Sequence, residues 1–356
     1  MHRCLELAQK GAGEVAPNPM VGAVIVCNGE IIGEGYHEKY GEAHAETNAI
    51  DAVKDKSLLS KSTLYVNLEP CSHYGKTPPC ALRIIDCGIP RVVIGHGDPF
   101  PKVAGGGVKM LRENGIEVIT DVLHAECAEI NKRFFTFHEK KRPYIILKWA
   151  QSADGFIDKI RENNKEKPIK ISNESTSQLN HQLRTEETAI MVGTRTALLD
   201  NPKLVARLAK GKNPVRVVID RSLKIPKDYN LFNNEAETLV FTESPPKSPL
   251  NGGLCGSTNN LTSYLSYSPL EGGGGALQIL AELHRRNLIS LIVEGGAMLL
   301  QSFIDEDLWD EIYVETAENL VLENGVKSPE LKNVKLREEK RFGENVIRTF
   351  VRKKIQ

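Results

Sequence analysis

The 356-residue sequence lacks the features that would place it in a membrane, on a nucleic acid or among disulfide-linked secreted proteins. No apolar run approaches the ~18 residues that are needed to cross a bilayer. The 46 basic residues are balanced by 46 acidic ones, and aromatic residues make up only 6% of the chain. A basic surface with stacking aromatics, which would suit nucleic acid, is therefore not expected. Seven cysteines, scattered and odd in number, favour reduced thiols, and we expect a cytoplasmic protein.

Short apolar strands alternate with helical segments in the first part of the chain. The Asn28-Gly29 pair is a hairpin signal that would join the first two strands. We expect strands over 21–26, 31–32, 64–67, 91–95 and 116–119, and helices over 1–11, 44–53, 79–87 and 107–114. A hairpin followed by repeated strand–helix units predicts a mixed α/β sheet with helices on both faces.

The pattern restarts at Pro143, after a basic and aromatic stretch over 131–142. We expect strands over 144–148, 190–192, 216–219, 238–241, 291–293 and 312–314, and helices over 174–183, 277–286 and 297–303. The chain is therefore expected to hold two α/β domains, 1–142 and 143–356. Residues 244–275 are rich in Gly, Ser, Pro and Asn without apolar periodicity, so we expect a flexible surface insertion there, a functional lid being the alternative.

The clearest chemical pattern is His44-Ala45-Glu46 followed by Pro70-Cys71 and by Cys80. One imidazole and two thiolates provide three ligands for Zn²⁺ and leave one tetrahedral position open for water. Zinc lowers the pKa of such a water toward ~7, and Glu46 is placed to move protons without being a ligand. This is the arrangement of the zinc-dependent base deaminases.

Three interpretations of the zinc site compete. A deaminase acting on a small pyrimidine is the first. A nucleic-acid base deaminase with an accessory domain would need the basic or aromatic surface that the composition lacks. A zinc-stabilised scaffold whose second domain only binds nucleotide would need a closed site of four ligands, and His73 is the nearby residue that could complete it.

The sequence resembles one family along nearly its whole length, apart from 244–275. The first part carries PNPMVG at 17–22, GYH at 35–37, HAE at 44–46, LEPCSHYGKTPPC at 68–80 and DP at 98–99. The second part carries SADG at 152–155, GTRT at 193–196, DNP at 200–202 and VEGG at 293–296. These motifs are similar to those of the bifunctional deaminase–reductases of riboflavin biosynthesis, in which eight residues separate the two cysteines.

This resemblance implies a fold and two consecutive activities. It implies a cytidine-deaminase-like three-layer domain followed by a dihydrofolate-reductase-like α/β domain. The first would hydrolyse the 2-amino group of 2,5-diamino-6-(5-phosphoribosylamino)pyrimidin-4(3H)-one, with Zn²⁺ bound by His44, Cys71 and Cys80 and Glu46 as the catalytic residue. The second would use NADPH to reduce the opened ribose, giving 5-amino-6-(5-phosphoribitylamino)uracil. We expect a homo-oligomer, a dimer or a tetramer, that acts on these small phosphorylated pyrimidines.

The resemblance also implies further site residues. Polar side chains of the first domain would contact substrate, namely Asn18, His37, His73 and Lys76, although His37 and His73 are also compatible with polar loops. The segment that opens a helix after Glu294 would line the cofactor, through Gly296, Ala297, Met298, Leu299, Leu300, Gln301 and Ser302. Other cofactor positions are Ala150, Ser152, Lys170, Thr196 and Asp200. The substrate phosphate and its surroundings would meet Pro168, Arg184, Leu204, Arg207 and Glu294.

Alternatives remain open for several of these positions. A strand–Gly-Gly–helix segment is often only a tight turn, and either arginine could be a solvated surface charge. No GxGxxG motif is present, so a Rossmann domain is not supported. Pro168 and Lys170 stand where the family usually carries Ser and Trp, and Arg221 stands where a small hydroxyl residue is more usual.

Overall fold

The computed structural model describes residues 1–353 except for 75–77, 101–102, 247–260 and 268–273. Contacts within the chain divide it into two compact units, Met1–Lys141 and Arg142–Gln356. Arg142 belongs to the second unit because its guanidinium donates hydrogen bonds to the Asp310 carboxylate and to the Pro143 carbonyl. The expected boundary, between 142 and 143, lies one residue further along the chain.

The first unit is built on a five-stranded mixed sheet with the strand order β2-β1-β3-β4-β5. Its strands are β1 (Gly22–Cys27), β2 (Glu30–Tyr36), β3 (Thr63–Leu68), β4 (Arg91–His96) and β5 (Glu117–Ile119). Strand β1 pairs antiparallel with both β2 and β3, whereas β3, β4 and β5 are parallel. Asn28 and Gly29 both have positive φ, as a tight hairpin turn requires.

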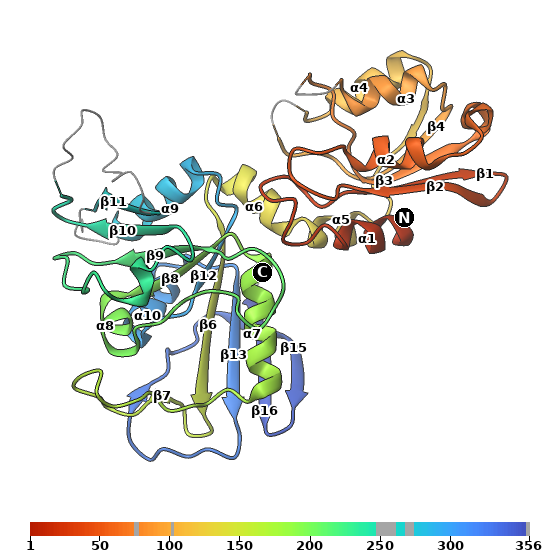
Figure 1. The fold of residues 1–356 in the computed structure, drawn as a ribbon. Helices are drawn as coiled ribbons and strands as arrows, with labels where there is room; N and C mark the ends of the chain where they lie inside the picture. Colours follow the sequence, from red (N-terminus) through yellow and green to blue (C-terminus); the bar gives the residue numbers. More distant parts are fainter. Residues whose placement is uncertain (75–77, 101–102, 247–260, 268–273, 354–356) are drawn as a thin grey trace. The chain divides into compact units, whose positions relative to one another are not determined.

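Helices cover both faces of this sheet (Figure 1). They are α1 (His2–Gln9), α2 (Ala45–Ala52), α3 (Cys80–Asp86), α4 (Gly106–Glu113), α5 (His124–Ile130) and α6 (Lys132–Lys140). Side chains along β1 alternate between the faces. Ala23 and Ile25 pack with residues of α2, α3 and α4, while Val24 packs with Cys4 and Leu7 of α1.

The second unit is built on a nine-stranded sheet with the order β11-β10-β9-β8-β12-β6-β13-β16-β15. The strands are β6 (Tyr144–Ser152), β8 (Ala189–Gly193), β9 (Val215–Ile219), β10 (Thr238–Thr242), β11 (Thr262–Ser266), β12 (Ser290–Val293), β13 (Glu311–Ala317), β15 (Val334–Phe342) and β16 (Asn345–Arg352). All pairings are parallel as far as β13, and β16 and β15 then close the sheet as an antiparallel hairpin. Strand β7 (Phe156–Asp158) pairs separately with β14 (Val326–Lys327).

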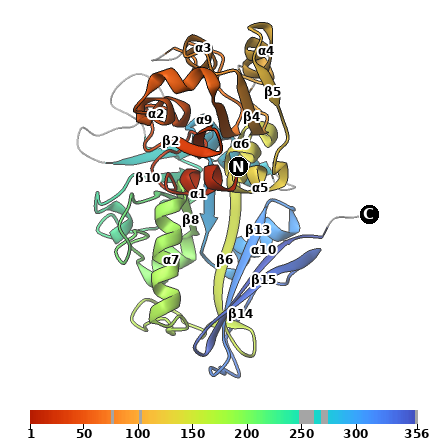
Figure 2. The same ribbon diagram turned by 90° about the vertical axis from the view of Figure 1, so that its right-hand side faces the viewer.

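Helices flank this sheet in the described part of the second unit (Figures 1 and 2). They are α7 (Glu174–Glu186), α8 (Thr194–Asp200), α9 (Gly274–Arg285) and α10 (Ala297–Asp305). One core cluster joins α9 and α10 to Met191 and Phe241, and the other joins α8 to Ile190 and Val240. Neighbouring residues of one strand thus belong to different cores. This explains why strands of this unit are apolar throughout, because a parallel sheet is buried on both faces.

The expected α/β class is confirmed, and every strand and helix named from the sequence is present. The expectation for 244–275 is wrong at Thr262–Ser266, which forms β11 and pairs in register with β10. Residues 247–260 and 268–273 of this segment lie outside the described residues. Helices α5, α6 and α8 and the hairpin of β15 and β16 were not expected. None of the helices among the described residues is long and apolar enough to cross a membrane.

Candidate functional site

Three metal-binding side chains of the first unit meet at one point. The ligand atoms of His44, Cys71 and Cys80 all lie within 4.8 Å of one another. The His44 Nδ1 atom is 3.7 Å from the Cys71 Sγ atom and 3.4 Å from the Cys80 Sγ atom. One imidazole and two thiols at these separations fit a tetrahedral Zn²⁺ ion with a fourth position free.

Two helix starts bring these residues together. His44 is the N-cap of α2, and Cys80 is the first residue of α3, so the positive ends of both helix dipoles face the cluster. A Cβ atom on Gly35 of β2 would lie only 2.4 Å from the Ala49 nitrogen of α2. Glycine at this position therefore allows β2 and α2 to touch through their backbones, and the start of α2 can reach the cysteine loop.

The contacts of the cluster favour the thiolate form of Cys71. A hydrogen bond with Cys80, together with the contact to His44, lowers the pKa of Cys71, whereas the same hydrogen bond and burial raise the pKa of Cys80. The backbone N–H of Cys80 donates to the same sulfur at 3.3 Å. Because the thiolate is the form that binds metal, the local hydrogen bonds prepare Cys71 as a ligand.

Glu46 lies in the first turn of α2, two positions from His44, with only 4% of its surface exposed. Burial raises the pKa of its carboxyl group to about 7, and the nearby imidazole of His44 partly offsets this effect. A carboxyl group with a pKa near neutrality can both accept and return a proton. The structure thus places a group of this kind beside the three metal-binding residues.

His37 and Asn18 form a connected pair at the same end of the sheet. The His37 Nδ1 atom is 3.0 Å from the Ala43 carbonyl oxygen, so it carries the proton, and the Asn18 amide donates to Nε2 at 3.1 Å. His37 is 2% exposed, and its ring meets that of His44 edge-on. Both ring nitrogens are therefore engaged within the protein, and this geometry suits orienting Asn18 better than contacting a substrate.

The loop that carries Asn18 is held by two buried asparagines that the sequence did not single out. Asn67 accepts from the Gly22 N–H and donates to the Met20 carbonyl. Asn131 binds the N–H and the carbonyl of Met20, from 111 positions along the chain. Nothing in the local sequence signals such distant side-chain clamps.

His73 and Lys76 were expected on the loop between the cysteines. Lys76 lies outside the described residues. The His73 ring packs edge-on against Phe100 with 6.0 Å between ring centroids, and its buried Nδ1 atom has no hydrogen-bond partner among the described residues. His73 is not part of the metal-binding group, so the closed four-ligand site that the scaffold interpretation requires is not formed by the described residues.

Glu69, directly before Pro70-Cys71, organises the loop after β4. Its buried carboxylate accepts hydrogen bonds from four backbone N–H groups, those of Asp98, Gly105, Gly107 and Val108. The charge of a buried carboxylate is well compensated by several amide donors. The sequence motif contained Glu69, but only the structure shows what it binds.

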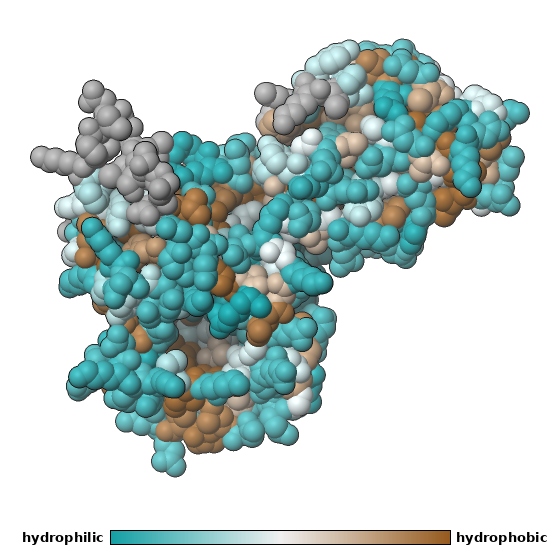
Figure 3. Space-filling view, in the orientation of Figure 1, coloured by the Kyte–Doolittle hydropathy of each residue, from teal (hydrophilic) through white to brown (hydrophobic). Residues whose placement is uncertain are grey.

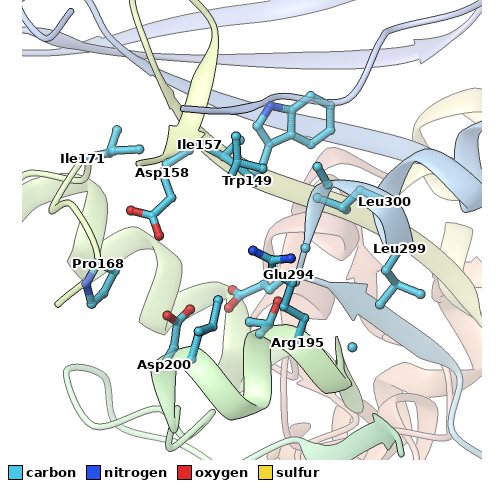
Figure 4. Close-up of a pocket in the computed structure, with 18 of the residues that line it drawn as sticks. Trp149, Ile157, Asp158, Pro168, Ile171, Arg195, Asp200, Glu294, Leu299 and Leu300 are labelled. Carbon is cyan, nitrogen blue, oxygen red and sulfur yellow. The ribbon is translucent and has the colours of Figure 1, made fainter. Parts of the chain in front are cut away.

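The second unit has a cavity of about 750 Å³ at the carboxyl ends of its parallel strands. This is where open α/β sheets bind ligands. Hydrophobic residues gather beside a hollow on this face of the second unit (Figure 3). In Figure 4, Asp158, Pro168 and Asp200 lie on one side, Trp149, Leu299 and Leu300 lie on the other, and Arg195 and Glu294 lie between them.

Most of the residues expected to bind the cofactor line this cavity. They are Ala150, Lys170, Thr196, Asp200, Gly296, Ala297, Met298, Leu299 and Leu300. The others do not line it: Ser152 is fully buried and bonded to Asp154, Gln301 bonds to Asp305, and Ser302 bonds to the Leu299 carbonyl. Gln301 and Ser302 lie on α10 beyond its first turn, and the period of the helix turns their side chains away from the cavity.

The start of α10 suits a phosphate. Its N-cap is Gly296, with φ +73 and no side-chain cap, so the first amides of the helix are not bound by a capping side chain. A Cβ atom on Gly296 would lie 3.2 Å from the Thr196 Oγ1 atom. Glycine therefore allows α8 and α10 to approach each other, and the uncapped amides can bind an anion.

Only some of the residues expected to bind the substrate of the second unit line this cavity. Pro168 and Glu294 line the cavity. Arg184 does not, because its guanidinium pairs with the Glu294 carboxylate and also donates to the Val205 carbonyl. Leu204 is buried in a core cluster, and Arg207 lines a separate cavity of about 400 Å³.

Glu294 is a largely buried charge in the cavity wall, with only 10% of its side chain exposed. Burial alone would raise the pKa of its carboxyl group, but the positive charges of Arg184 and Lys148 hold it below its ordinary value. The Lys148 Nζ atom is 4.0 Å from the Glu294 Oε1 atom. Glu294 is therefore ionised, and its surroundings are cationic.

Arg161 also belongs to the cavity wall, although no motif in the sequence points to it. It is 4% exposed, and its guanidinium donates to both Asp158 and Asp200, which come from β7 and from the end of α8. Its Nη1 atom also donates to the carbonyls of Glu166 and Leu199. Asp200, expected to contact the cofactor, is thus bound by an arginine of the same wall.

Comparisons with known proteins match a domain family to each unit. Residues 1–96 match the cytidine and deoxycytidylate deaminase zinc-binding region, and residues 143–321 match the RibD C-terminal domain. The riboflavin biosynthesis protein RibD of Aquifex aeolicus is 38% identical over 362 residues, covering 99% of this chain and 97% of the relative.

Solved structures give the same result. The diaminohydroxyphosphoribosylaminopyrimidine deaminase/5-amino-6-(5-phosphoribosylamino)uracil reductase of Thermotoga maritima is 34% identical, with a TM-score of 0.84. Acinetobacter baumannii RibD is 28% identical, with a TM-score of 0.85. Each comparison covers 99% of this chain and 97% of the other.

The fold and the two sites define a zinc-dependent deaminase joined to a dihydrofolate-reductase-like reductase. The chain belongs to the RibD family of riboflavin biosynthesis proteins. The cofactors of this class are Zn²⁺ in the deaminase and NADPH in the reductase, and the His/Cys cluster and the uncapped start of α10 fit them.

Proposed function

We propose that the two units catalyse consecutive reactions on one phosphorylated pyrimidine. Residues 1–142 would hydrolyse the 2-amino group of 2,5-diamino-6-(5-phosphoribosylamino)pyrimidin-4(3H)-one and release ammonia. Residues 143–356 would then reduce the ribosyl chain with NADPH to give 5-amino-6-(5-phosphoribitylamino)uracil. The observation that carries the proposal is the buried Glu46 beside the three-residue group of His44, Cys71 and Cys80.

In the deaminase reaction, His44, Cys71 and Cys80 would hold Zn²⁺. When bound, the metal supplies Lewis-acid activation of a water molecule. The Glu46 carboxylate takes the proton of the attacking water and returns it to the departing amino nitrogen, as its pKa near neutrality allows. Asn18 would contact the pyrimidine, held in position by His37, and His73 and Lys76 would contact other parts of the substrate.

In the reductase reaction, NADPH would occupy the cavity between Ala150, Thr196 and the start of α10. The amides at Gly296 and Ala297 would bind a phosphate of the cofactor, and the apolar wall at Trp149 would exclude water from hydride transfer. Glu294 would accept hydrogen bonds from the substrate's hydroxyl groups. Arg184 positions Glu294, and Arg207 would bind the substrate phosphate from the neighbouring cavity.

We also propose that the enzyme works as a homo-oligomer, a dimer or a tetramer, in the cytoplasm. The six described cysteines are all unbridged, which suits a reducing compartment. Light scattering on the purified protein measures the assembly directly, and a monomeric mass would contradict the proposal.

The proposed function is tested by a paired assay of the wild type and Glu46→Gln. Each protein receives the diaminopyrimidine ribotide, and ammonia release, NADPH oxidation and zinc content are measured separately. We expect Glu46→Gln to keep zinc and to lose ammonia release by at least about 10²-fold, the scale of general acid–base catalysis. The variant should still oxidise NADPH when it is given the deaminated intermediate. A wild type that holds zinc but performs neither reaction would contradict the proposal.

A further inference from the structure

The charges that line the reductase cavity do not cancel. Its three carboxylates are all paired: Asp158 and Asp200 bind Arg161, and Glu294 binds Arg184 and lies near Lys148. Two further cations line the same cavity, Arg195 and Lys170, and neither has a carboxylate partner among the described residues. The wall therefore carries an unpaired positive charge that an anionic ligand would neutralise.

Arg195 is the more specific of these two cations. It lies in the first turn of α8, is exposed, and makes one hydrogen bond among the described residues, from Nη2 to the Arg161 carbonyl at 3.4 Å. A guanidinium has five N–H donors in a rigid fork, so most of its donors remain available. Asp158 and Asp200 hold the Arg161 side chain, and the Arg161 carbonyl accepts from one side of the Arg195 guanidinium, which lines the cavity.

The position of Arg195 indicates which phosphate of a nicotinamide cofactor this residue would bind. Thr196, the next residue, lies against Gly296 at the uncapped start of α10, where backbone amides suit the pyrophosphate. Arg207, which suits the substrate phosphate, lines a different cavity. The remaining group is the 2′-phosphate of NADPH, a terminal monoester whose free oxygens match a guanidinium fork.

We propose that Arg195 selects NADPH over NADH by binding the 2′-phosphate of the cofactor. This inference rests on the proposed reductase function and adds to it the residue that sets cofactor choice. Lys170 adds charge to the same wall, but an ammonium lacks the fork that recognises a monoester in two places. The resemblance to known relatives did not assign a role to Arg195.

Binding and turnover are both measured to test the proposal. Trp149 lines the cavity, so quenching of tryptophan fluorescence reports the dissociation constants of NADPH and NADH without catalysis. Arg195→Gln should weaken NADPH binding by about 10- to 100-fold, as expected for a lost charge-assisted hydrogen bond, and leave NADH binding within about twofold. Arg195→Lys keeps the charge, so its dissociation constant for NADPH should lie between those of the wild type and Arg195→Gln. The same pattern is expected in kcat/KM for the two cofactors.

The control is Arg285→Gln, which removes the same charge from an exposed arginine paired with Glu282 on α9. It should leave both dissociation constants as in the wild type. Equal weakening of NADPH and NADH by Arg195→Gln would overturn the proposal and assign Arg195 to the pyrophosphate. An increased KM for the substrate with unchanged NADPH binding would also overturn it. A wild type that binds neither cofactor would instead contradict the reductase function itself.

Discussion

Arg184 and Glu294, 110 positions apart, form an ion pair in which the Nη2 and Oε2 atoms are 2.5 Å apart. Their side chains are only 14% and 10% exposed, so the pair lies almost entirely away from water. It ties α7 to the segment that follows β12, at the wall of the reductase cavity. The position of Glu294 therefore depends on a residue that does not itself line the cavity.

Arg184→Met should destabilise the second unit and reduce its reductase activity. Removing one partner of a buried ion pair leaves the other charge uncompensated, at a cost of about 3–5 kcal/mol, of which Lys148 would offset part. Both tryptophans, Trp149 and Trp309, lie in the second unit, so urea unfolding followed by tryptophan fluorescence measures this loss specifically.

The double variant Arg184→Met with Glu294→Gln serves as the control. It removes both charges, so its free energy of unfolding should exceed that of Arg184→Met, whereas reductase activity should stay low because the Glu294 carboxylate is absent. The single variant Glu294→Gln is measured as well. If the stability loss of the double variant equals the sum of the losses in the two single variants, the ion pair has no coupling energy.

Removing zinc should separate the two activities. A chelator should abolish ammonia release, because His44, Cys71 and Cys80 are the metal-binding group of the first unit. NADPH oxidation with the deaminated intermediate should be unchanged, since no metal-binding group of three or more residues is found in the described part of the second unit. One equivalent of Zn²⁺ should restore ammonia release. Loss of both activities on chelation would show that the second unit depends on the metal.

The sequence could predict the grouping of His44, Cys71 and Cys80 because strand–helix periodicity brings two helix starts to one end of a sheet. It could not predict that His37 is buried with both ring nitrogens bonded, since loop residues have no period that reports burial. The chemical motif identified the site, and the tertiary contacts determine which of its polar residues can meet a substrate.

In the second unit, too, the sequence predicts local patterns but not contacts between residues that lie far apart in the chain. The apolar strands and the glycines after β12 could be read directly, because their patterns are local. The bridge from Arg161 to Asp200 joins a charged loop after β7 to the end of a helix 39 positions away, and only the tertiary fold places them together. Strand β11 was missed because its apolar alternation is short and stands within a segment rich in Gly and Ser.

His181 should make the stability of the second unit fall at acidic pH. Burial, together with the charges of Arg184 and Arg207, lowers its pKa from 6.5 to about 4. Between these values the unfolded chain binds a proton that the folded chain does not, so stability is present above about pH 6.5 and is lost as the pH falls. Protonation of this one group should lower the free energy of unfolding by about 1.4 kcal/mol as the pH falls from roughly 7.5 to 5.5.

His181→Gln removes the titrating group, and its urea-unfolding free energy should depend less on pH by that amount. The free energies of both proteins are measured by tryptophan fluorescence at the two pH values. The comparison is between slopes, so a uniform loss of stability in the variant does not affect it. Equal slopes in the two proteins would show that His181 does not contribute.

Gly35→Ala should disrupt the deaminase site without a change to any ligand. The added Cβ atom would lie 2.4 Å from the Ala49 nitrogen and 2.7 Å from the Ala45 carbonyl oxygen, and both are backbone atoms of α2 that cannot rotate away. The helix must therefore shift, at a cost of about 1–3 kcal/mol or more, and it carries His44 and Glu46 with it. Zinc content per chain and ammonia release should both fall, while NADPH oxidation is unchanged. Ile31→Ala, an exposed change on the same strand, should keep both properties. Full zinc content in Gly35→Ala would mean that the metal-binding group tolerates a displaced α2.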